Sequence, residues 1–309
     1  MNTLDQLRKY SIVVADTADF HAIELFKPID ATTNPSLILK QAQSSVTAGL
    51  IEQTQNKLGS GHFKSAADAA LDLSIRFGVE IANRIEGYVS TEVDARLSFN
   101  TERSIEQAHT IIENYQKYGI GRGRILIKLA STWEGIQAAR ALESDGIGCN
   151  LTLLFCEAQA IAAANANATL ISPFVGRIYD WFVARGDVPV SMDKDPGVLS
   201  VRNILKLYKS HAVATIVMGA SFRTADQVLA LAGCDRLTIS PALLEELDSR
   251  NQTLTPVAIA GPTDRTIETL TRDEFLLALS ADPMANEKLA DGITRFIQDQ
   301  HTLEALLRR

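Results

Sequence analysis

The sequence is poor in cysteine and histidine, and neither residue is arranged as a metal site. The three cysteines, Cys149, Cys156 and Cys234, are too few for a disulfide framework and show no Cys-x-x-Cys spacing. We therefore expect free thiols in a reducing compartment. The five histidines are scattered without the spacing of metal ligands. The sequence thus predicts no metal ion and no disulfide-stabilised fold.

Long apolar segments and an excess of positive charge are also missing. No apolar run approaches the roughly 18 residues of a membrane-spanning helix, and the N-terminal residues do not resemble a secretory leader. Lysine and arginine number 30 against 37 acidic residues, a formal charge of −7. Such mild acidity disfavours binding to nucleic acid or to an anionic membrane, so an anionic ligand would depend on local arginines. We expect a cytoplasmic protein.

The first strand–helix turn lacks the glycine-rich fingerprint of a dinucleotide-binding sheet, which disfavours an open doubly wound fold and a nicotinamide cofactor. The chain contains instead a regular alternation of short apolar segments and helical patterns. Strands are predicted over residues 11–16, 30–35, 88–94, 124–130, 149–155, 170–176, 215–221 and 234–240. Helices are predicted over 36–55, 63–84, 101–118, 133–144, 157–166, 196–211 and 224–232. Eight strands in this pattern predict an α/β fold, a (β/α)8 TIM barrel, formed by residues 1–309 as a single domain.

The two ends of the chain lie outside this repeat. Residues 2–9 predict a short amphipathic helix, and residues 251–270 predict a connecting loop. Apolar residues after position 282 recur at helical spacing and predict a C-terminal helix packed on the barrel: Leu289, Ile293, Phe296, Ile297, Leu303, Leu306 and Leu307. We therefore expect additional N- and C-terminal helices and no second domain.

A lysine stands in the middle of the most apolar predicted strand. The segment Ile125-Leu-Ile-Lys-Leu-Ala130 reads as a parallel strand buried on both faces, with Lys128 pointing into the barrel. Burial favours the neutral amine, which is a nucleophile able to form a Schiff base with a ketone or aldehyde. The alternative is a structural lysine that pairs with a buried carboxylate.

Polar residues occupy alternate positions near the carboxyl ends of the other strands. Side chains two residues apart on a strand share a face, and barrel active sites lie at these strand ends. Apolar residues would fill such positions in an ordinary buried strand. The pattern predicts a polar pocket around Lys128 that recognises hydroxyl groups, formed by Asp16, Thr32, Asn34, Glu92, Asp94, Asn150, Thr152, Ser172, Ser221 and Arg223.

Chemistry suggests roles for the charged members of this set. Asp16 and Glu92 could move protons during Schiff-base formation and carbon–carbon cleavage, or could simply neutralise a buried cation. Arg177 and Arg223 follow the sixth and seventh strands, where barrels commonly bind phosphate. Arginine suits two-point contacts to an oxyanion, although a surface salt bridge would explain either residue as well.

Seven motifs, in order along most of the chain, resemble those of the transaldolase family in its longer, bacterial and eukaryotic form. They are Val13-Val-Ala-Asp-Thr17, Asp30-Ala-Thr-Thr-Asn-Pro-Ser36, Ser90-Thr-Glu-Val-Asp-Ala-Arg96, Ile125-Leu-Ile-Lys-Leu-Ala-Ser-Thr132, Asn150-Leu-Thr-Leu-Leu154, Ile171-Ser-Pro-Phe-Val-Gly-Arg177 and Met218-Gly-Ala-Ser-Phe-Arg223. The resemblance is weaker over residues 40–85, 185–195 and 251–270. It is silent on any partner surface there.

The resemblance implies a role for each matching residue. Lys128 would form the Schiff base, Glu92 would move protons with a water held near Thr152, and Asp16 would be the base at the C4 hydroxyl. Substrate hydroxyls or the enamine would be contacted by Asn34, Asn150, Ser172 and Thr32, and the sugar phosphate by Arg177, Ser221 and Arg223. The implied reaction moves a dihydroxyacetone unit from sedoheptulose 7-phosphate to glyceraldehyde 3-phosphate. It needs no cofactor, and family members are often homodimers.

Two other functions remain as alternatives. A fructose 6-phosphate aldolase would use the same lysine but would release its three-carbon ketone without an acceptor. The apolar Phe174 offers no hydroxyl to orient a water or to donate a proton, which favours the transferase. A catalytically silent barrel that binds sugar phosphates is less favoured, because a buried lysine is costly to keep.

Overall fold

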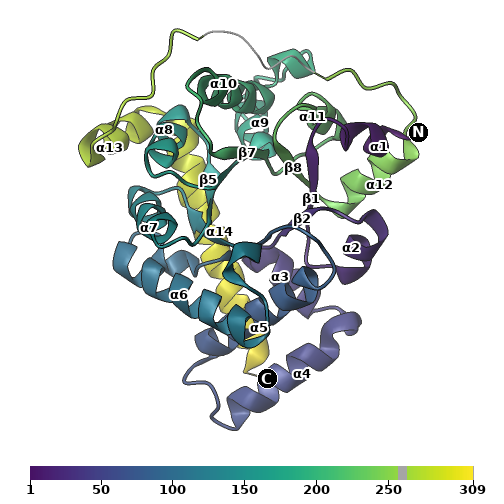
Figure 1. Ribbon diagram of the computed structural model, residues 1–309, viewed down its shortest axis with the longest axis vertical. Coiled ribbons are helices and arrows are strands. Elements are labelled where there is room, and N and C mark those ends of the chain that lie inside the picture. The colour runs from purple at the N-terminus through teal and green to yellow at the C-terminus, as the bar shows by residue number, and fades with distance from the viewer. Residues whose placement is uncertain (257–262, 309) are drawn as a thin grey trace.

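The strands of the chain close into a parallel barrel. The computed structural model describes residues 1–256 and 263–308. Within them each strand pairs in parallel with the next, and the last pairs with the first (Figure 1). The strands are β1 (Ile12–Asp16), β2 (Asp30–Thr32), β3 (Val89–Glu92), β4 (Ile125–Ala130), β5 (Cys149–Leu154), β6 (Leu170–Pro173), β7 (Ile216–Gly219) and β8 (Arg236–Ile239). The predicted (β/α)8 barrel is confirmed.

Helices form an outer layer around the strands (Figure 1). Those that precede or connect the strands are α1 (Thr3–Leu7), α2 (Phe20–Phe26), α3 (Pro35–Ala42), α4 (Ala48–Gly59), α5 (Ala66–Ala82), α6 (Thr101–Lys117), α7 (Trp133–Ser144), α8 (Glu157–Asn165), α9 (Val175–Val183), α10 (Pro196–Ser210) and α11 (Ala225–Leu229). After β8 come α12 (Pro241–Ser249), α13 (Arg272–Ala281) and α14 (Pro283–Leu307). The 3₁₀ turns are η1 (Ser45–Thr47), η2 (Ala95–Leu97), η3 (Arg122–Arg124) and η4 (Met192–Lys194). In the described part of the chain, no helix is long and apolar enough to span a bilayer.

The predicted continuous helix over 36–55 is wrong. Helix α3 ends at Ala42, and α4 begins only after η1. The Ser44 hydroxyl accepts the Val46 N–H, and the Thr47 hydroxyl donates to the Gln41 carbonyl. Short polar side chains that bond to nearby backbone in this way compete with the helical ladder. The predicted loop over 251–270 has no helix or strand in its described residues; positions 257–262 lie outside them.

The two faces of β4 separate as its sequence predicts. Ile125, Ile127 and Leu129 belong to the large core between the strands and the helices. Leu126 lies instead in a small cluster inside the barrel with Val14, Leu170 and Met218. Because side chains alternate along a strand, Lys128 points inward above this apolar layer. The layer closes the floor of the barrel mouth.

A buried ion pair closes the opposite end of the barrel. Asp30 begins β2 and Arg236 begins β8, and their side chains are 5% and 10% exposed. Arg236 Nε lies 2.8 Å from one Asp30 oxygen, and the Tyr88 N–H donates to the other at 2.7 Å. One Asp30 oxygen makes the ion pair and the other accepts the hydrogen bond, so Asp30 links β2 to β8 and to the residue before β3.

Replacing Asp30 by alanine should lower the free energy of unfolding by about 3–5 kcal/mol, because the Arg236 charge would stay buried without a partner. Urea denaturation would measure this. Asp226→Ala is the control, since the Asp226 side chain is 58% exposed where it pairs with Arg250. It should cost about 0–1 kcal/mol. Equal effects of the two substitutions would contradict a structural role for the Asp30–Arg236 pair.

Helix α14 crosses the carboxyl end of the barrel. It packs against α9 and β5 near its start and against α3, α5 and η2 near its end, and Figure 1 shows it running from the side of α13 to the side of α4. Asp299 accepts a hydrogen bond from Ser36, and Glu304 lies 2.6 Å from Arg96. The predicted C-terminal helix is confirmed, and it lies across the mouth that the polar strand residues surround.

Candidate active site

Most of the side chains predicted from the strand pattern meet at one small cavity inside the barrel mouth. Its volume is about 70 Å³. The predicted residues in its wall are Asp16, Thr32, Asn34, Lys128, Thr152, Ser172, Phe174, Arg177 and Ser221. Of the other predicted residues, Glu92 and Asn150 flank Lys128, and Arg223 lies beside Ser221. We call this space the substrate cavity.

Lys128 lies between two polar neighbours from the adjoining strands. In the parallel register it pairs with Glu92 of β3 and with Asn150 of β5. Its side chain is only 4% exposed. The Nζ atom donates to the Thr33 carbonyl at 3.0 Å and lies 3.2 Å from Glu92 Oε2. The amine is therefore held within direct proton-transfer distance of a carboxylate.

Burial shifts the pKa values of both carboxylates of the site in the same direction. It raises the pKa of Glu92 and the pKa of Asp16 above their ordinary values, although the charge of Lys128 opposes the shift in each case. The Thr32 hydroxyl donates to Asp16 at 3.0 Å, which also favours the ionised form. A carboxyl group whose pKa is raised toward neutrality can both accept and release a proton during a reaction.

A chain of hydrogen bonds fixes the wall of the site next to Lys128. Asn150 donates to the Ser90 hydroxyl at 3.0 Å, and Ser172 donates to the Asn150 amide oxygen at 2.6 Å. The Thr152 hydroxyl is buried and has no hydrogen-bond partner among the described residues. Buried polar groups are normally paired, so Thr152 is well placed to bind a hydroxyl or a water beside Lys128.

The two arginines differ in burial and in their partners. Arg177 lies over the ring of Phe174 at 4.9 Å, and burial with Arg295 and Arg223 nearby lowers its pKa. Its Nη1 atom has no hydrogen-bond partner in the described structure. Arg223 is more exposed and pairs with Asp180 at 2.6 Å. An anion at this end of the cavity would relieve the repulsion between the arginines and pair the free nitrogen of Arg177.

Helix α14 contributes to the site in a way that sequence reasoning missed. The ring of Phe296 lies 6.0 Å from Lys128 Nζ and 5.6 Å from the Arg177 guanidinium. Gly292 allows the close approach, because a Cβ there would lie 2.6 Å from a Leu153 methyl carbon and 2.9 Å from Arg177 Nη1. Phe296 belongs to the apolar helical pattern of its segment and Gly292 does not, and no signal in the sequence marks either residue as part of a site.

The predicted place of Asp94 in the pocket around Lys128 is wrong. Strand β3 ends at Glu92, so the two-residue period does not extend to Asp94. Asp94 instead caps η2 and pairs with Arg96.

The sequence also predicts free thiols, and all three cysteines are free. In the described residues no three histidine, cysteine, aspartate or glutamate side chains are grouped as metal ligands.

The fold and the site define the protein's class: a (β/α)8 barrel with a buried lysine and two carboxylates at the carboxyl ends of its strands. Comparison with known proteins places it more closely. The chain belongs to the transaldolase/fructose-6-phosphate aldolase family, whose model matches residues 13–307.

Curated relatives match almost the whole chain. A protein of Shewanella sp. (strain MR-4) named transaldolase is 51% identical, with 99% of this chain and 98% of the relative covered. Proteins of the same name from Shewanella baltica (strain OS155) and Shewanella oneidensis (strain MR-1) are 51% and 50% identical over the same shares. These relatives carry the name of one branch of the family, whereas the family model covers both.

Proposed function

We propose that this protein is a transaldolase that works through a Schiff base on Lys128. It transfers a dihydroxyacetone unit from sedoheptulose 7-phosphate to glyceraldehyde 3-phosphate, giving erythrose 4-phosphate and fructose 6-phosphate. The observation that carries the proposal is the buried amine of Lys128, 3.2 Å from Glu92 and electrostatically coupled to Asp16. The name shared by the curated relatives supports the transferase branch.

Imine formation depends on Lys128 and Glu92. Glu92, which lies 3.2 Å from the lysine nitrogen, takes a proton from it. The amine then attacks the ketone carbon of the donor to give a carbinolamine. Glu92 returns its proton to the departing hydroxyl, and water leaves. The Thr152 hydroxyl is available to hydrogen-bond the departing oxygen.

Carbon–carbon cleavage depends on Asp16. As base, Asp16 removes the proton of the C4 hydroxyl, and the C3–C4 bond breaks to release an aldehyde. The bonding electrons pass into the iminium, which becomes an enamine. Thr32 orients the Asp16 carboxylate, and the Asn150–Ser172 pair offers hydrogen bonds to the remaining hydroxyls.

Transfer requires the enamine to survive until an acceptor arrives. Phe174 packs edge-on against Phe155, with ring centroids 5.7 Å apart, and Phe296 covers the lysine from α14. Apolar rings at these positions provide no proton donor next to the enamine. A fructose 6-phosphate aldolase is the second candidate, because the family model includes it. Turnover without an acceptor aldehyde distinguishes the two.

A coupled assay tests the proposed function. With sedoheptulose 7-phosphate and glyceraldehyde 3-phosphate together, we expect stoichiometric erythrose 4-phosphate and fructose 6-phosphate. With fructose 6-phosphate alone, we expect at most one equivalent of glyceraldehyde 3-phosphate per site. Steady release of dihydroxyacetone without an acceptor would favour the aldolase instead.

Arg177, Ser221 and Arg223 bind the phosphate in this proposal. Arg223→Ala should raise KM for phosphorylated donors by about 10- to 100-fold, because a charge-assisted contact to the phosphate is worth about 1.5–3 kcal/mol. The control is Arg272→Ala, which removes a comparable exposed arginine–carboxylate pair, with Glu134, away from the site. An unchanged KM for the phosphorylated donor in Arg223→Ala would reject the assignment.

The raised pKa values of Asp16 and Glu92 predict the acid limb of the pH profile. Both must lose a proton to act as bases, so kcat/KM should fall as the pH drops through their raised values. The fall should come clearly above pH ~3.9, where an exposed aspartate titrates. A kcat/KM profile from pH 4 to 9, taken with stability controls, would measure this. A flat profile down to the point of unfolding would contradict the assigned bases.

The proposed function also carries expectations about the partners, the location and the domain organisation of the protein. We expect free sugar phosphates as substrates, a cytoplasmic protein that folds as one domain, and a homodimer as the resemblance implies. Analytical ultracentrifugation of the native chain tests the homodimer, and a single cooperative unfolding transition tests the single domain.

A further inference from the structure

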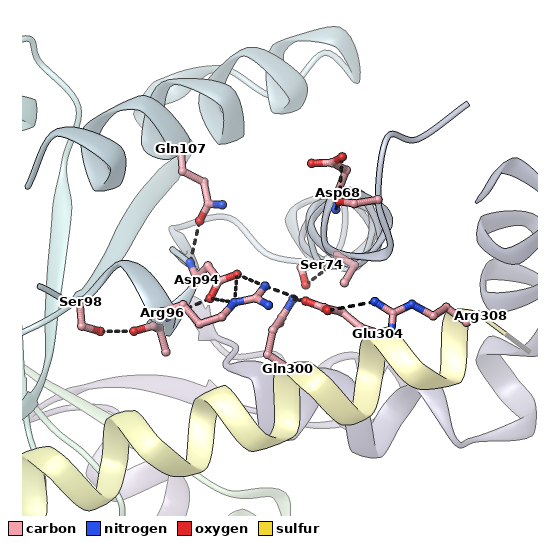
Figure 2. A network of polar contacts seen from close by, with 12 residues as sticks. Asp68, Ser74, Asp94, Arg96, Ser98, Gln107, Gln300, Glu304 and Arg308 are labelled. Atoms are coloured by element: carbon pink, nitrogen blue, oxygen red, sulfur yellow. Dashed lines mark hydrogen bonds and ion pairs between the residues drawn. The ribbon is translucent and has the colours of Figure 1, made fainter. Parts of the chain in front are cut away.

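A second and larger cavity lies behind Glu92. Its volume is about 460 Å³, against about 70 Å³ for the substrate cavity. We call it the rear cavity; its wall includes Thr33, Asn34, Glu92, Ala67, Ser74 and Gln300. Figure 2 shows its polar surroundings, with Gln300 on α14 and Ser74 on α5. Glu92 in its wall takes part in the reaction described above, but the space itself has no role there.

The two cavities meet at the lysine–glutamate pair. Asn34 lines both of them, Lys128 lines only the substrate cavity, and Glu92 lines only the rear cavity. The 3.2 Å contact between Lys128 Nζ and Glu92 Oε2 therefore joins the two spaces. A proton or water exchanged at Glu92 can reach the rear cavity without crossing the space that holds the sugar.

The rear cavity is suited to hold water. Its wall is more polar than apolar, and Asp94 and Arg96 are fixed there by their mutual ion pair and by the contact of Arg96 with Glu304 (Figure 2). Asp68, Arg96 and Arg103, which also line it, are exposed, so the cavity reaches the surface. A polar cavity needs only about 10–15 Å³ to hold one water, and this one is far larger.

The substrate cavity offers water a poorer route. Phe174 lines it, Phe296 lies 6.0 Å from Lys128 Nζ, and the phosphate of a bound sugar would lie at Arg177 and Arg223. These arginines follow β6 and β7, which lie across the closed barrel from β2 and β3, where the rear cavity begins. A bound substrate would thus occupy the mouth on one side and leave the rear cavity open on the other.

We propose that the rear cavity is the route by which water leaves and re-enters the Schiff base, separate from the entrance used by the sugar phosphates. The inference rests on the proposed imine at Lys128. In the carbinolamine the nitrogen lone pair forms the C=N bond, the C–O bond breaks, and protonated Glu92 gives its proton to the leaving oxygen. The products are an iminium, the Glu92 carboxylate and one water, which moves from beside Thr152 in the substrate cavity past Glu92 into the rear cavity. Hydrolysis is the reverse and draws a water from the same place.

Filling the rear cavity should slow this exchange without weakening substrate binding. Ala67→Trp and Ser74→Phe, alone and together, place aromatic rings in the cavity from α5. The measured quantity is the rate at which ¹⁸O from labelled water enters the C2 carbonyl of fructose 6-phosphate. The ketose is saturating and no acceptor is present. The rate of uncatalysed uptake is subtracted. We expect the double variant to lose about tenfold or more of the exchange rate, with KM within about twofold of wild type. The matched control is Ala48→Trp, at an exposed alanine outside both cavities, which should exchange at the wild-type rate.

The outcomes separate this inference from the proposed function. If the wild type shows no exchange above the uncatalysed rate, the imine itself fails. If the wild type exchanges and every folded filling variant exchanges equally fast, the rear cavity is not the water route. A higher KM with unchanged exchange at saturation would make it a sugar entrance and would also overturn the inference. Circular dichroism identifies folded variants, and the two single substitutions keep the test available if the double variant misfolds.

Discussion

Replacing Lys128 by alanine should abolish transfer of the dihydroxyacetone unit, lowering kcat by a factor on the order of 10⁶, as for other covalent nucleophiles. No other lysine lines the described part of the substrate cavity. Without the amine there is no imine to accept the electrons of the C3–C4 bond. The coupled assay for erythrose 4-phosphate, run at high enzyme concentration, would measure the loss.

The fold should survive this substitution. Glu92 would lose its cation, but burial already raises its pKa, so the carboxyl group can take a proton and stay buried as a neutral acid. Lys117→Ala, at an exposed lysine on α6, is the control and should keep full activity. Activity of a folded Lys128→Ala variant near the wild-type rate would refute the mechanism.

Replacing Asp16 by asparagine should separate imine formation from cleavage. The amide keeps the shape of the side chain and can still accept a hydrogen bond from Thr32, but it cannot take the C4 hydroxyl proton. We expect kcat for transfer to fall by about 10²- to 10⁴-fold, the usual contribution of a general base. Because imine formation depends on Glu92, exchange of ¹⁸O into fructose 6-phosphate should continue.

Comparing the rate of transfer with the rate of ¹⁸O exchange defines the role of Asp16. Asp5→Asn, at a carboxylate on the outer helix α1, is the control and should change neither rate. If Asp16→Asn loses exchange and transfer equally, Asp16 would be acting on imine formation or on the structure of the site. If it loses neither, Asp16 would not be a base in the reaction.

The strands and the inward-facing polar residues could be predicted because both follow the two-residue alternation of side chains along a strand. Side chains alternate along a strand, so placing Lys128 inside the barrel also fixed the faces of Leu126 and Ile127, and the structure agrees. The parallel pairing of β1 with β2 and of β5 with β6 then brings Asp16 and Thr32, and likewise Asn150 and Ser172, within hydrogen-bond distance. A polar residue in a buried strand is conspicuous because apolar residues would otherwise fill its position.

What escaped prediction depends on how distant segments pack. Phe296 lies at an ordinary apolar position of a helix, and only the path of α14 across the barrel brings it to Lys128. Gly292 is likewise explained by its contacts with Leu153 and Arg177. Asp94 was misplaced because β3 ends two residues earlier. The rear cavity arises from α3, α5, α6 and α14 together, and no periodicity in the sequence describes such a space.

In the proposed reaction Lys128 carries the sugar fragment as a Schiff base. The most direct test is reduction with borohydride in the presence of fructose 6-phosphate, followed by peptide mass spectrometry. We predict a dihydroxyacetone-derived adduct on the peptide that contains Lys128 and on no other peptide. An adduct on a different lysine, or none from folded protein, would contradict the account.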